Sequence, residues 1–264
     1  MSKRVLITGA AGGIGAATAA ELRARGARAV GLDLRAEDAD VIACDIRDQA
    51  SVERGVAEGI ERLGGLDVLI NNAGIGDAQS AGEAPDASAL AVIDVNLLGA
   101  WRVTAAALPA LLESRGRVVN VASGLAHLTV PFAPAYCMSK RGLVAYSDAL
   151  RLEHGDRLTV TTVYPGYIRT TIHETSTAKG VALEGAVPTE RVEDAARTLA
   201  GAALGRPRRD LATTRRGAIG YALARRAPRR VMDRLVGARM RQLVRSGHFD
   251  GSALAADFAS RTRA

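Results

Sequence analysis

Tyr136 and Lys140 stand four residues apart, inside the stretch 134–154 that the sequence predicts to be helical. Residues with this spacing share one face of an α-helix, so we expect the tyrosine hydroxyl and the lysine ammonium to point into the same space. A tyrosine is a poor acid or base near neutrality, because its ordinary pKa is about 10. A neighbouring cation favours the phenolate and lowers that pKa, and a tyrosine tuned in this way can exchange a proton with an alcohol oxygen.

A third candidate, Ser123, lies thirteen residues before Tyr136. It follows the apolar run 118–122, which predicts a buried strand. A hydroxyl at the carboxyl end of such a strand lies where open α/β sheets bind their ligands. The spacing of the tyrosine and the lysine is weak evidence by itself, because a surface lysine beside a half-buried tyrosine gives the same pattern. Other elements of the chain must therefore support the site.

A glycine-rich loop at residues 8–15 follows a predicted strand at 5–7 and precedes a predicted helix that ends near Arg25. Strand, glycine loop and helix in this order are typical of the first βα unit of a nucleotide-binding domain. Gly9, Gly13 and Gly15 allow the backbone to turn tightly and to approach a pyrophosphate at the helix N-terminus. The alternative is a glycine turn that serves only packing.

Asp33 ends the second predicted strand, 18 residues after Gly15. An acid at this place accepts hydrogen bonds from the ribose hydroxyls of an adenosine. The same carboxylate repels a 2′-phosphate, so Asp33 favours NAD over NADP. Arg35 points in the opposite direction, and a solvated loop acid is the alternative for Asp33 itself.

Predicted strands and helices alternate through the rest of the first 205 residues. We expect strands at 41–44, 66–70 and 158–163, and helices at 49–63, at 86–114 and from Thr189 to about Leu204, with Thr189 as N-cap. Asn96 falls inside the helix 86–114, where an asparagine indicates either a local irregularity that holds a water or an exposed polar position. Residues 171–185 are polar and lack a clear period, so we expect a mobile flap over a site.

This alternation predicts an α/β fold, a Rossmann-like doubly wound parallel sheet in a single domain with helices on both faces. The predicted strands end at Gly9, Asp33, Asn71, Ser123 and Pro165. In a parallel sheet these ends share one edge, so several weak signals combine into one predicted site at that edge.

The bulk composition fits one large globular domain. The chain has 264 residues, of which 48% are hydrophobic. We find no apolar run near the ~20 residues that a membrane span needs, and the start of the chain leads directly into a strand, which leaves no room for a signal peptide. Cys44 and Cys137 show neither metal nor disulfide spacing, so we expect no metal site and a reducing cytosol.

The net charge of +7 is concentrated near the C-terminus. Residues 201–264 hold 15 arginines against 4 acids, so the first 200 residues carry a net charge of −4. Within 215–245, apolar residues recur at helical steps between arginines, and Pro228 is expected to separate two amphipathic helices. These helices either pack over the substrate entrance or rest on an anionic membrane surface. The arginines carry no nucleic-acid motif and few aromatic residues accompany them, so we expect no nucleic-acid partner.

Taken in order and at this spacing, the motifs resemble those of the short-chain dehydrogenase/reductase family. The resemblance spans about residues 5 to 170 and rests on Thr-Gly-x-x-x-Gly-Ile-Gly at 8–15, Asn-Asn-Ala-Gly at 71–74, Asn96, Ser123, Tyr136-x-x-x-Lys140 and Pro165-Gly166. It implies an enzyme that moves a hydride between a nicotinamide cofactor and a secondary alcohol or ketone. The loop 125–132 and the flap near Ile172 are expected to supply apolar walls, which favours a fairly apolar substrate. A small-molecule substrate and a homo-oligomer, dimer or tetramer, are also implied.

The resemblance also implies residue roles. Tyr136 would be the general acid and base, Ser123 would bind the substrate oxygen, Lys140 would hold the nicotinamide ribose and lower the pKa of Tyr136, and Asn96 would anchor a water. Asp33 would bind the adenosine ribose, and Asp45 with Ile46 the adenine. The remaining residues implied in cofactor binding are Gly9, Gly13, Ile14, Gly15, Asn72, Ala73, Gly74, Pro165, Gly166, Ile168 and Thr170.

The C-terminal part departs from the family pattern. Many members end in a final strand and a tail that completes a tetramer, whereas residues 206–211 here lead into a basic helical extension. We therefore divide the chain into a catalytic domain, 1–205, and an extension, 206–264, which resembles extensions of members that act on lipid-like, steroid-like or retinoid-like alcohols. Two alternatives stay open: a catalytically silent NAD-binding sensor or scaffold, and a sugar-nucleotide epimerase or dehydratase.

Overall fold

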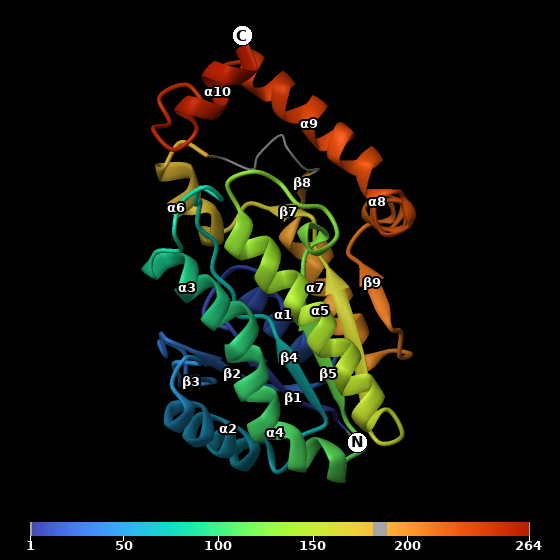
Figure 1. Ribbon diagram of the computed structural model, residues 1–264. Helices are drawn as coiled ribbons and strands as arrows, with labels where there is room; N and C mark the ends of the chain where they lie inside the picture. Colours follow the sequence, from blue (N-terminus) through green and yellow to red (C-terminus); the bar gives the residue numbers. More distant parts are fainter. Residues whose placement is uncertain (1, 182–188, 264) are drawn as a thin grey trace.

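The computed structural model describes residues 2–181 and 189–263. Seven parallel strands form its main sheet, in the order β3-β2-β1-β4-β5-β6-β9 (Figure 1). Their bounds are β1 Arg4–Thr8, β2 Arg28–Asp33, β3 Val41–Ala43, β4 Val68–Asn71, β5 Arg117–Val121, β6 Thr159–Tyr164 and β9 Asp210–Ala212. The order reverses between β1 and β4, which is the place where doubly wound sheets open a crevice for ligands.

Helices cover both faces of the sheet (Figure 1). One layer consists of α1 Gly13–Ala24 and α7 Val192–Leu204, and the other of α2 Gln49–Leu63, α4 Ala100–Glu113 and α5 Pro134–His154. Each layer has its own core of aliphatic side chains: Leu22 and Leu199 belong to the first, and Leu63 and Leu150 to the second. The predicted α/β fold, doubly wound around a parallel sheet in one domain, is confirmed.

Local sequence explains where several helices begin and end. The Asp48 carboxylate accepts a hydrogen bond from the Ser51 amide at the start of α2, and Gly64 ends that helix in the left-handed conformation. Pro134 occupies the first turn of α5, where its missing N–H leaves no helical bond unmade. The predicted bounds of α2 and α5, 49–63 and 134–154, are confirmed.

The predicted helix 86–114 contains an irregularity at Asn96. It runs as α3 Ala87–Ile93, a π-helical segment at Asp94–Gly99 and then α4. By length and composition alone the 27-residue stretch Ala87–Glu113 could cross a membrane, which the search for an apolar run missed. Here it packs against α2 and α5 as a core helix of the fold.

Two other expectations about the second half were wrong. Thr189 does not cap a helix: Thr189–Glu190 is strand β8, which pairs with β7 Tyr167–Ile168, and α7 begins at Val192. A final strand is also present, because β9 lies beside β6 within the stretch assigned to the extension. The predicted flap includes a 3-10 turn at Thr171–His173 and α6 Glu174–Ala178, and its residues 182–185 lie outside the described chain.

The C-terminal extension is helical, as predicted. It consists of α8 Arg215–Arg226, α9 Arg229–Arg245 and α10 Ala256–Arg263, with Pro228 immediately before α9. The second half of α9 is anchored, since Met240 and Leu243 join a small core with Phe132 and Phe249. The three helices extend beyond the end of the sheet that lies opposite the N-terminus (Figure 1).

Candidate active site

Tyr136 and Ser123 come together at the carboxyl end of β5. Ser123 follows that strand, and its hydroxyl accepts a hydrogen bond from the Leu125 amide at 3.2 Å. Burial raises the pKa of Tyr136 to about 12, while a hydrogen bond with Ser123 acts in the opposite direction. The expectation that Lys140 lowers the pKa of Tyr136 is wrong for the protein alone: loss of solvent raises this pKa, and Lys140, whose Nζ lies 5.8 Å from the ring centre, is not among the groups that shift it.

Lys140 is buried, with only 3% of its surface exposed. Its ammonium donates a hydrogen bond to the Val121 carbonyl at 2.9 Å, which fixes the side chain beneath the end of β5. Burial lowers the pKa of Lys140 to about 8, and within residues 2–181 and 189–263 no carboxylate pairs with its ammonium to compensate the lost hydration. Such a poorly solvated amine at the end of a strand is typical of a position where a ligand binds to the amine.

Asn96 is also buried, and the π-helical segment positions it toward the loop after β4. Its side-chain amide donates to the Ile75 carbonyl at 2.9 Å, and its Oδ1 accepts from the Ile75 amide at 2.8 Å. A second donation, at 3.1 Å, reaches Ser139 on α5. Asn96 therefore ties three segments of the site together, and the reading of it as an exposed polar residue is wrong. π-Helical turns of this kind are frequent at functional sites.

The glycine loop borders a groove of about 250 Å³. Gly9 and Gly13 have φ angles of 69° and 53°, a region that side chains disfavour. Gly15 serves a different need: a Cβ there would lie 1.9 Å from the Gly9 carbonyl oxygen, so this glycine allows α1 to approach the strand. The groove provides exposed backbone at a helix N-terminus, which fits a pyrophosphate.

Asn72 connects the glycine loop to the loop after β4. Its side chain donates to the Thr8 carbonyl at 3.0 Å, and the Thr8 hydroxyl accepts from the backbone amides of Asn72 and Ala73, each at 3.0 Å. Gly74 lies close behind, where a Cβ would be 3.4 Å from the Lys140 Nζ. These contacts fix the two loops on either side of the groove.

Asp33 and Arg35 both border the outer end of this groove. One oxygen of Asp33 accepts from the Ala11 amide at 2.9 Å, and the other from the Arg35 amide at 3.2 Å. The carboxylate is thus held in place beside the glycine loop. Asp45 and Ile46 do not border the groove in this structure: Asp45 is paired with Arg47 at 2.7 Å, and Ile46 is buried against Gly99.

A narrow space of about 60 Å³ joins this groove to a second pocket. Its walls come from the start of α1, from the ends of β4, β5 and β6, from α5, and from β7 and the turn after it. The lining residues are Ile14, Asn72, Gly74, Val121, Ala122, Ser123, Tyr136, Lys140, Pro165, Gly166, Ile168, Thr170, Ile172 and His173. Tyr136, Ser123 and Lys140 therefore meet where the two larger spaces join.

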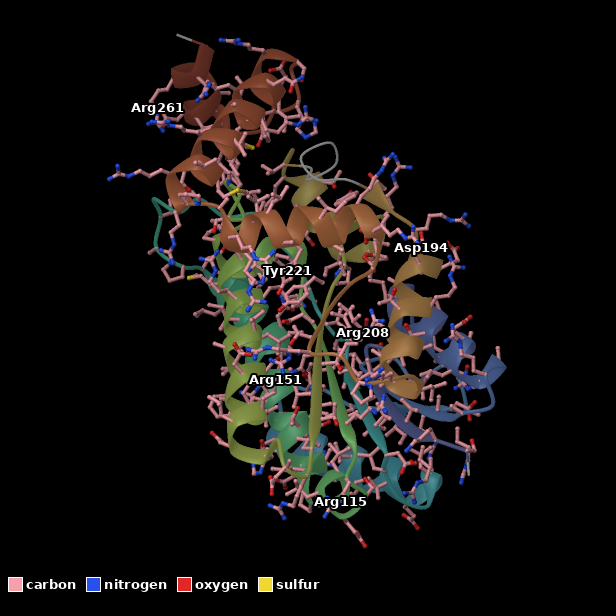
Figure 2. The ribbon with its side chains drawn as sticks, turned by 90° about the vertical axis from the view of Figure 1, so that its right-hand side faces the viewer. Arg115, Arg151, Asp194, Arg208, Tyr221 and Arg261 are labelled. Atoms are coloured by element: carbon pink, nitrogen blue, oxygen red, sulfur yellow. The ribbon has the colours of Figure 1, made fainter. Side chains whose placement is uncertain are left out.

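The second pocket, of about 360 Å³, has mainly apolar walls. Leu125 and Leu128 form the wall predicted from the loop 125–132, and α8 and α9 add Tyr221 and Met232. The rings of Tyr221 and Tyr164 lie with their centres 4.4 Å apart at a tilt of 32°, and Tyr221 is on the side of the helix that faces the sheet (Figure 2). The extension therefore supplies one wall of the pocket that ends at Tyr136.

Sequence reasoning missed two residues of this pocket, His173 and Glu190. His173 stacks on Tyr167 at 4.4 Å, and burial lowers its pKa, so the imidazole is neutral at pH 7. Glu190 accepts from the Gly166 amide at 2.9 Å and from the hydroxyls of Thr213 and Thr214, which ties the end of β6 to the start of α8. Only the predicted flap pointed to His173, and the assignment of 189–204 as helix concealed Glu190.

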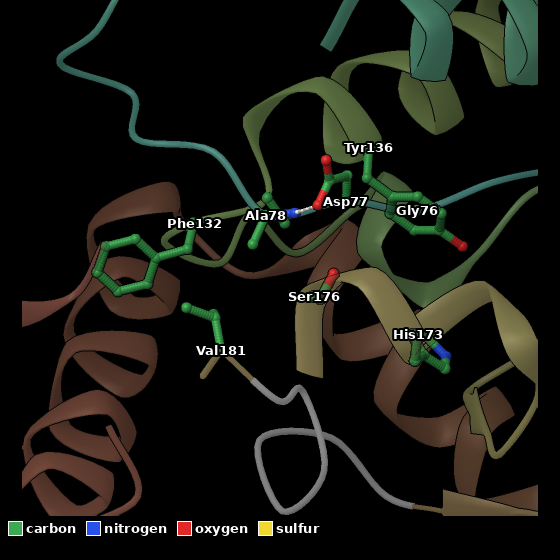
Figure 3. Close-up of a pocket in the computed structure, with 9 residues that line it drawn as sticks. Gly76, Asp77, Ala78, Phe132, Tyr136, His173, Ser176 and Val181 are labelled. Carbon is green, nitrogen blue, oxygen red and sulfur yellow. Dashed lines mark hydrogen bonds between the residues drawn. The ribbon is translucent and has the colours of Figure 1, made fainter. Parts of the chain in front are cut away.

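The opposite side of Tyr136 is closely packed. A recess of only about 10 Å³ separates Tyr136 and His173 from Phe132 and Val181 (Figure 3). Asp77 closes its edge, held by Lys179 at 2.7 Å. The tyrosine hydroxyl is thus accessible through the apolar pocket and the narrow joining space.

The chain belongs to the short chain dehydrogenase family, whose sequence model matches residues 3–180. The D-threitol dehydrogenase of Mycolicibacterium smegmatis is 33% identical to it over an alignment of 207 positions, which covers 72% of this chain and 80% of that protein. A protein of Streptomyces violaceoruber, assigned as ketoacyl reductase 1 of the granaticin polyketide synthase, is 36% identical over an alignment of 187 positions, which covers 64% of this chain and 69% of that protein.

Solved structures agree with this assignment. A short chain dehydrogenase of Burkholderia cenocepacia in complex with NADP superimposes with a TM-score of 0.74 at 26% identity, covering 89% of this chain and 99% of that one. A short-chain dehydrogenase of Streptomyces avermitilis gives 0.73 at 25% identity, covering 84% and 92%. The chain is thus an oxidoreductase of a family that binds a nicotinamide cofactor and acts on CH–OH groups of small molecules.

Proposed function

We propose that the protein is an NAD(H)-dependent enzyme that interconverts a fairly apolar secondary alcohol and its ketone. One observation carries the proposal: Tyr136, Ser123 and Lys140 meet where a glycine-lined groove joins an apolar pocket. The groove has the backbone donors that a dinucleotide requires, and the pocket suits an apolar substrate. A screen of secondary alcohols and ketones, followed by NADH absorbance, tests the proposal directly.

In this mechanism the nicotinamide cofactor supplies or accepts the hydride, and the side chains handle the proton. The Ser123 hydroxyl donates a hydrogen bond to the substrate oxygen and stabilises the charge that develops there. Tyr136 gives its phenolic proton to that oxygen during reduction and takes it back during oxidation. Lys140 would hold the cofactor ribose, and Asn96 fixes the loop at Ile75 through two hydrogen bonds.

The proton state of Tyr136 favours carbonyl reduction. A phenol with a pKa near 12 is protonated throughout the physiological range, so it begins as a proton donor. Oxidation would instead require the phenolate, which is scarce at pH 7.

This difference predicts a different pH profile for each direction of the reaction. Between pH 6 and 8, kcat/KM for ketone reduction should stay flat, because the tyrosine remains protonated. In the same range, kcat/KM for alcohol oxidation should rise about tenfold per pH unit, in proportion to the phenolate fraction. Steady-state rates in both directions measure this, and an oxidation rate that levels off below pH 7 would contradict the assignment.

For the cofactor we expect tighter binding of NADH than of NADPH, by about tenfold or more. A 2′-phosphate beside the Asp33 carboxylate would place like charges together, which costs several kcal/mol. The ratio of the NADPH and NADH Kd values should be smaller for Asp33→Ala than for the wild type. It should be larger for Arg35→Ala, a change at a second residue that borders the same groove. Fluorescence titration gives three pairs of Kd values, one pair for each protein, and wild-type NADPH binding as tight as that of NADH would refute this preference.

A catalytically silent NAD-binding protein is the second candidate function. Such a protein has no need to keep Ser123, Tyr136 and Lys140 around one small space, so their meeting argues against it. The two candidates differ in one experiment: a silent protein binds NADH but turns over none of the screened alcohols and ketones. We further propose a cytoplasmic homo-oligomer, which sedimentation velocity and cell fractionation would test.

A further inference from the structure

The helical pair formed by α8 and the first half of α9 leaves its apolar side chains largely uncovered. No residue of α8 is buried, and neither is any residue of α9 before Met240. Ile219, Leu223 and Leu235 expose 64%, 62% and 59% of their surfaces, and Val231 exposes 44%. Amphipathic helices of globular proteins normally turn such residues to the core. An exposed apolar surface of this kind marks an interaction site.

This surface borders the mouth of the apolar pocket. Leu223 and Leu235 are exposed and at the same time line that pocket, one from each helix. A molecule that rests on the helical pair therefore lies next to the entrance through which the substrate reaches Tyr136. This location suits a surface that takes part in the entry of an apolar substrate and the release of its product.

The same two helices are strongly basic. They contain ten arginines and a single acid, Asp233. Arg225 pairs with Asp210 at 3.4 Å, but in the described part of the chain no salt bridge joins Arg226, Arg229 or Arg230 to an acid. Arginines and exposed aliphatic residues thus occur together on one helical pair, which is the composition of helices that lie in a lipid headgroup layer.

We propose that α8 and the first half of α9 dock on an anionic membrane surface and turn the pocket mouth toward the lipid. The apolar residues enter the boundary between headgroups and acyl chains, while the arginines contact lipid phosphates. Docking itself rests only on the helical pair, whereas delivery of an apolar substrate from the bilayer also rests on the function proposed above.

A second copy of the chain is a poorer occupant. Two such surfaces facing each other in a symmetric dimer would bring together two copies of α8 and α9, which over their full lengths carry a net charge of +9 in each copy. A nucleic acid would match the charge, but its phosphate backbone offers nothing for Ile219 and Leu223 to pack against. An anionic bilayer satisfies both the charge and the apolar side chains.

Vesicle sedimentation of the full-length protein tests the proposal. The probes are vesicles of phosphatidylcholine alone and of phosphatidylcholine mixed with phosphatidylglycerol. We expect the protein to pellet with the anionic vesicles and to be released as salt rises. Arg226→Gln combined with Arg230→Gln should weaken binding about thirtyfold. Ile219→Ser combined with Val231→Ser should also reduce it, because fewer apolar groups enter the bilayer.

The matched control is Arg206→Gln combined with Arg208→Gln, which removes the same charge from exposed positions before β9. This variant should bind like the wild type, and equal weakening in the control would overturn the proposal. An absence of pelleting at low salt would also overturn the proposal. The same holds if the vesicles stay unbound and the protein instead forms a dimer or a nucleic-acid complex that the Ile219/Val231 variant disrupts. None of these positions lines the pocket, so turnover of a short soluble ketone should persist in every variant. Failure of the proposed enzyme function would appear as lost turnover and leave sedimentation unchanged.

Discussion

Tyr136→Phe should lower kcat by about 10²–10⁴-fold in both directions, the range that a general acid or base contributes. The change removes one oxygen and little volume. Tyr136 packs against the two small apolar clusters that contain Leu125 and Val92, and phenylalanine retains every carbon atom of its side chain. NADH affinity and the thermal midpoint should therefore remain close to those of the wild type, as measured by fluorescence titration and circular dichroism.

A second tyrosine on the same helix provides the control. Tyr146 is also largely buried, its pKa is likewise raised to about 12, and its ring lies 5.1 Å from that of Trp101. It is remote from the narrow space that holds Ser123 and Lys140, so Tyr146→Phe should change kcat by no more than about twofold. Near-native turnover of a folded Tyr136→Phe protein would show that another group moves the proton.

Local signals in the sequence were sufficient for most of the catalytic edge. Apolar runs located the buried strands, and parallel connections require their carboxyl ends to meet, which brings Gly9, Asp33 and Ser123 to one edge of the sheet. Asn96 was identified by its poor fit to a helix interior, and the π-helical segment there accounts for it.

Other features depend on tertiary contacts that no local pattern encodes. Threonine is a common N-cap residue, but Thr189 pairs with Tyr167 and therefore belongs to a strand. The short strand at Asp210–Ala212 is stabilised by its place beside β6 and carries no periodic signal of its own. The pKa of Tyr136 follows from how much solvent the folded chain excludes, which spacing along a helix does not reveal.

Lys140→Met should retain the fold and gain stability at pH 7, while losing cofactor affinity and turnover. Burial lowers the pKa of Lys140 from 10.5 to about 8, so keeping this lysine charged costs about 3 kcal/mol at 1.36 kcal/mol per pKa unit. The hydrogen bond from Lys140 to the Val121 carbonyl stabilises the folded state by about 1.5–3 kcal/mol. Methionine has a similar length and no charge to desolvate, so the variant should be more stable by about 1 kcal/mol.

The pH dependence distinguishes this cause from a simple packing effect. Between pH 8 and 10.5 the unfolded lysine is still protonated while the folded one has lost its proton, so the unfolded state binds more protons and wild-type stability rises with pH. Methionine does not titrate, and the gap between the two proteins should therefore close or reverse by pH 10. Urea unfolding at pH 7 and pH 10 measures both free energies. If the variant were less stable at pH 7 by several kcal/mol, the lysine would stabilise the fold. That result would exclude the interpretation that Lys140 destabilises the protein and is kept because a ligand binds to it.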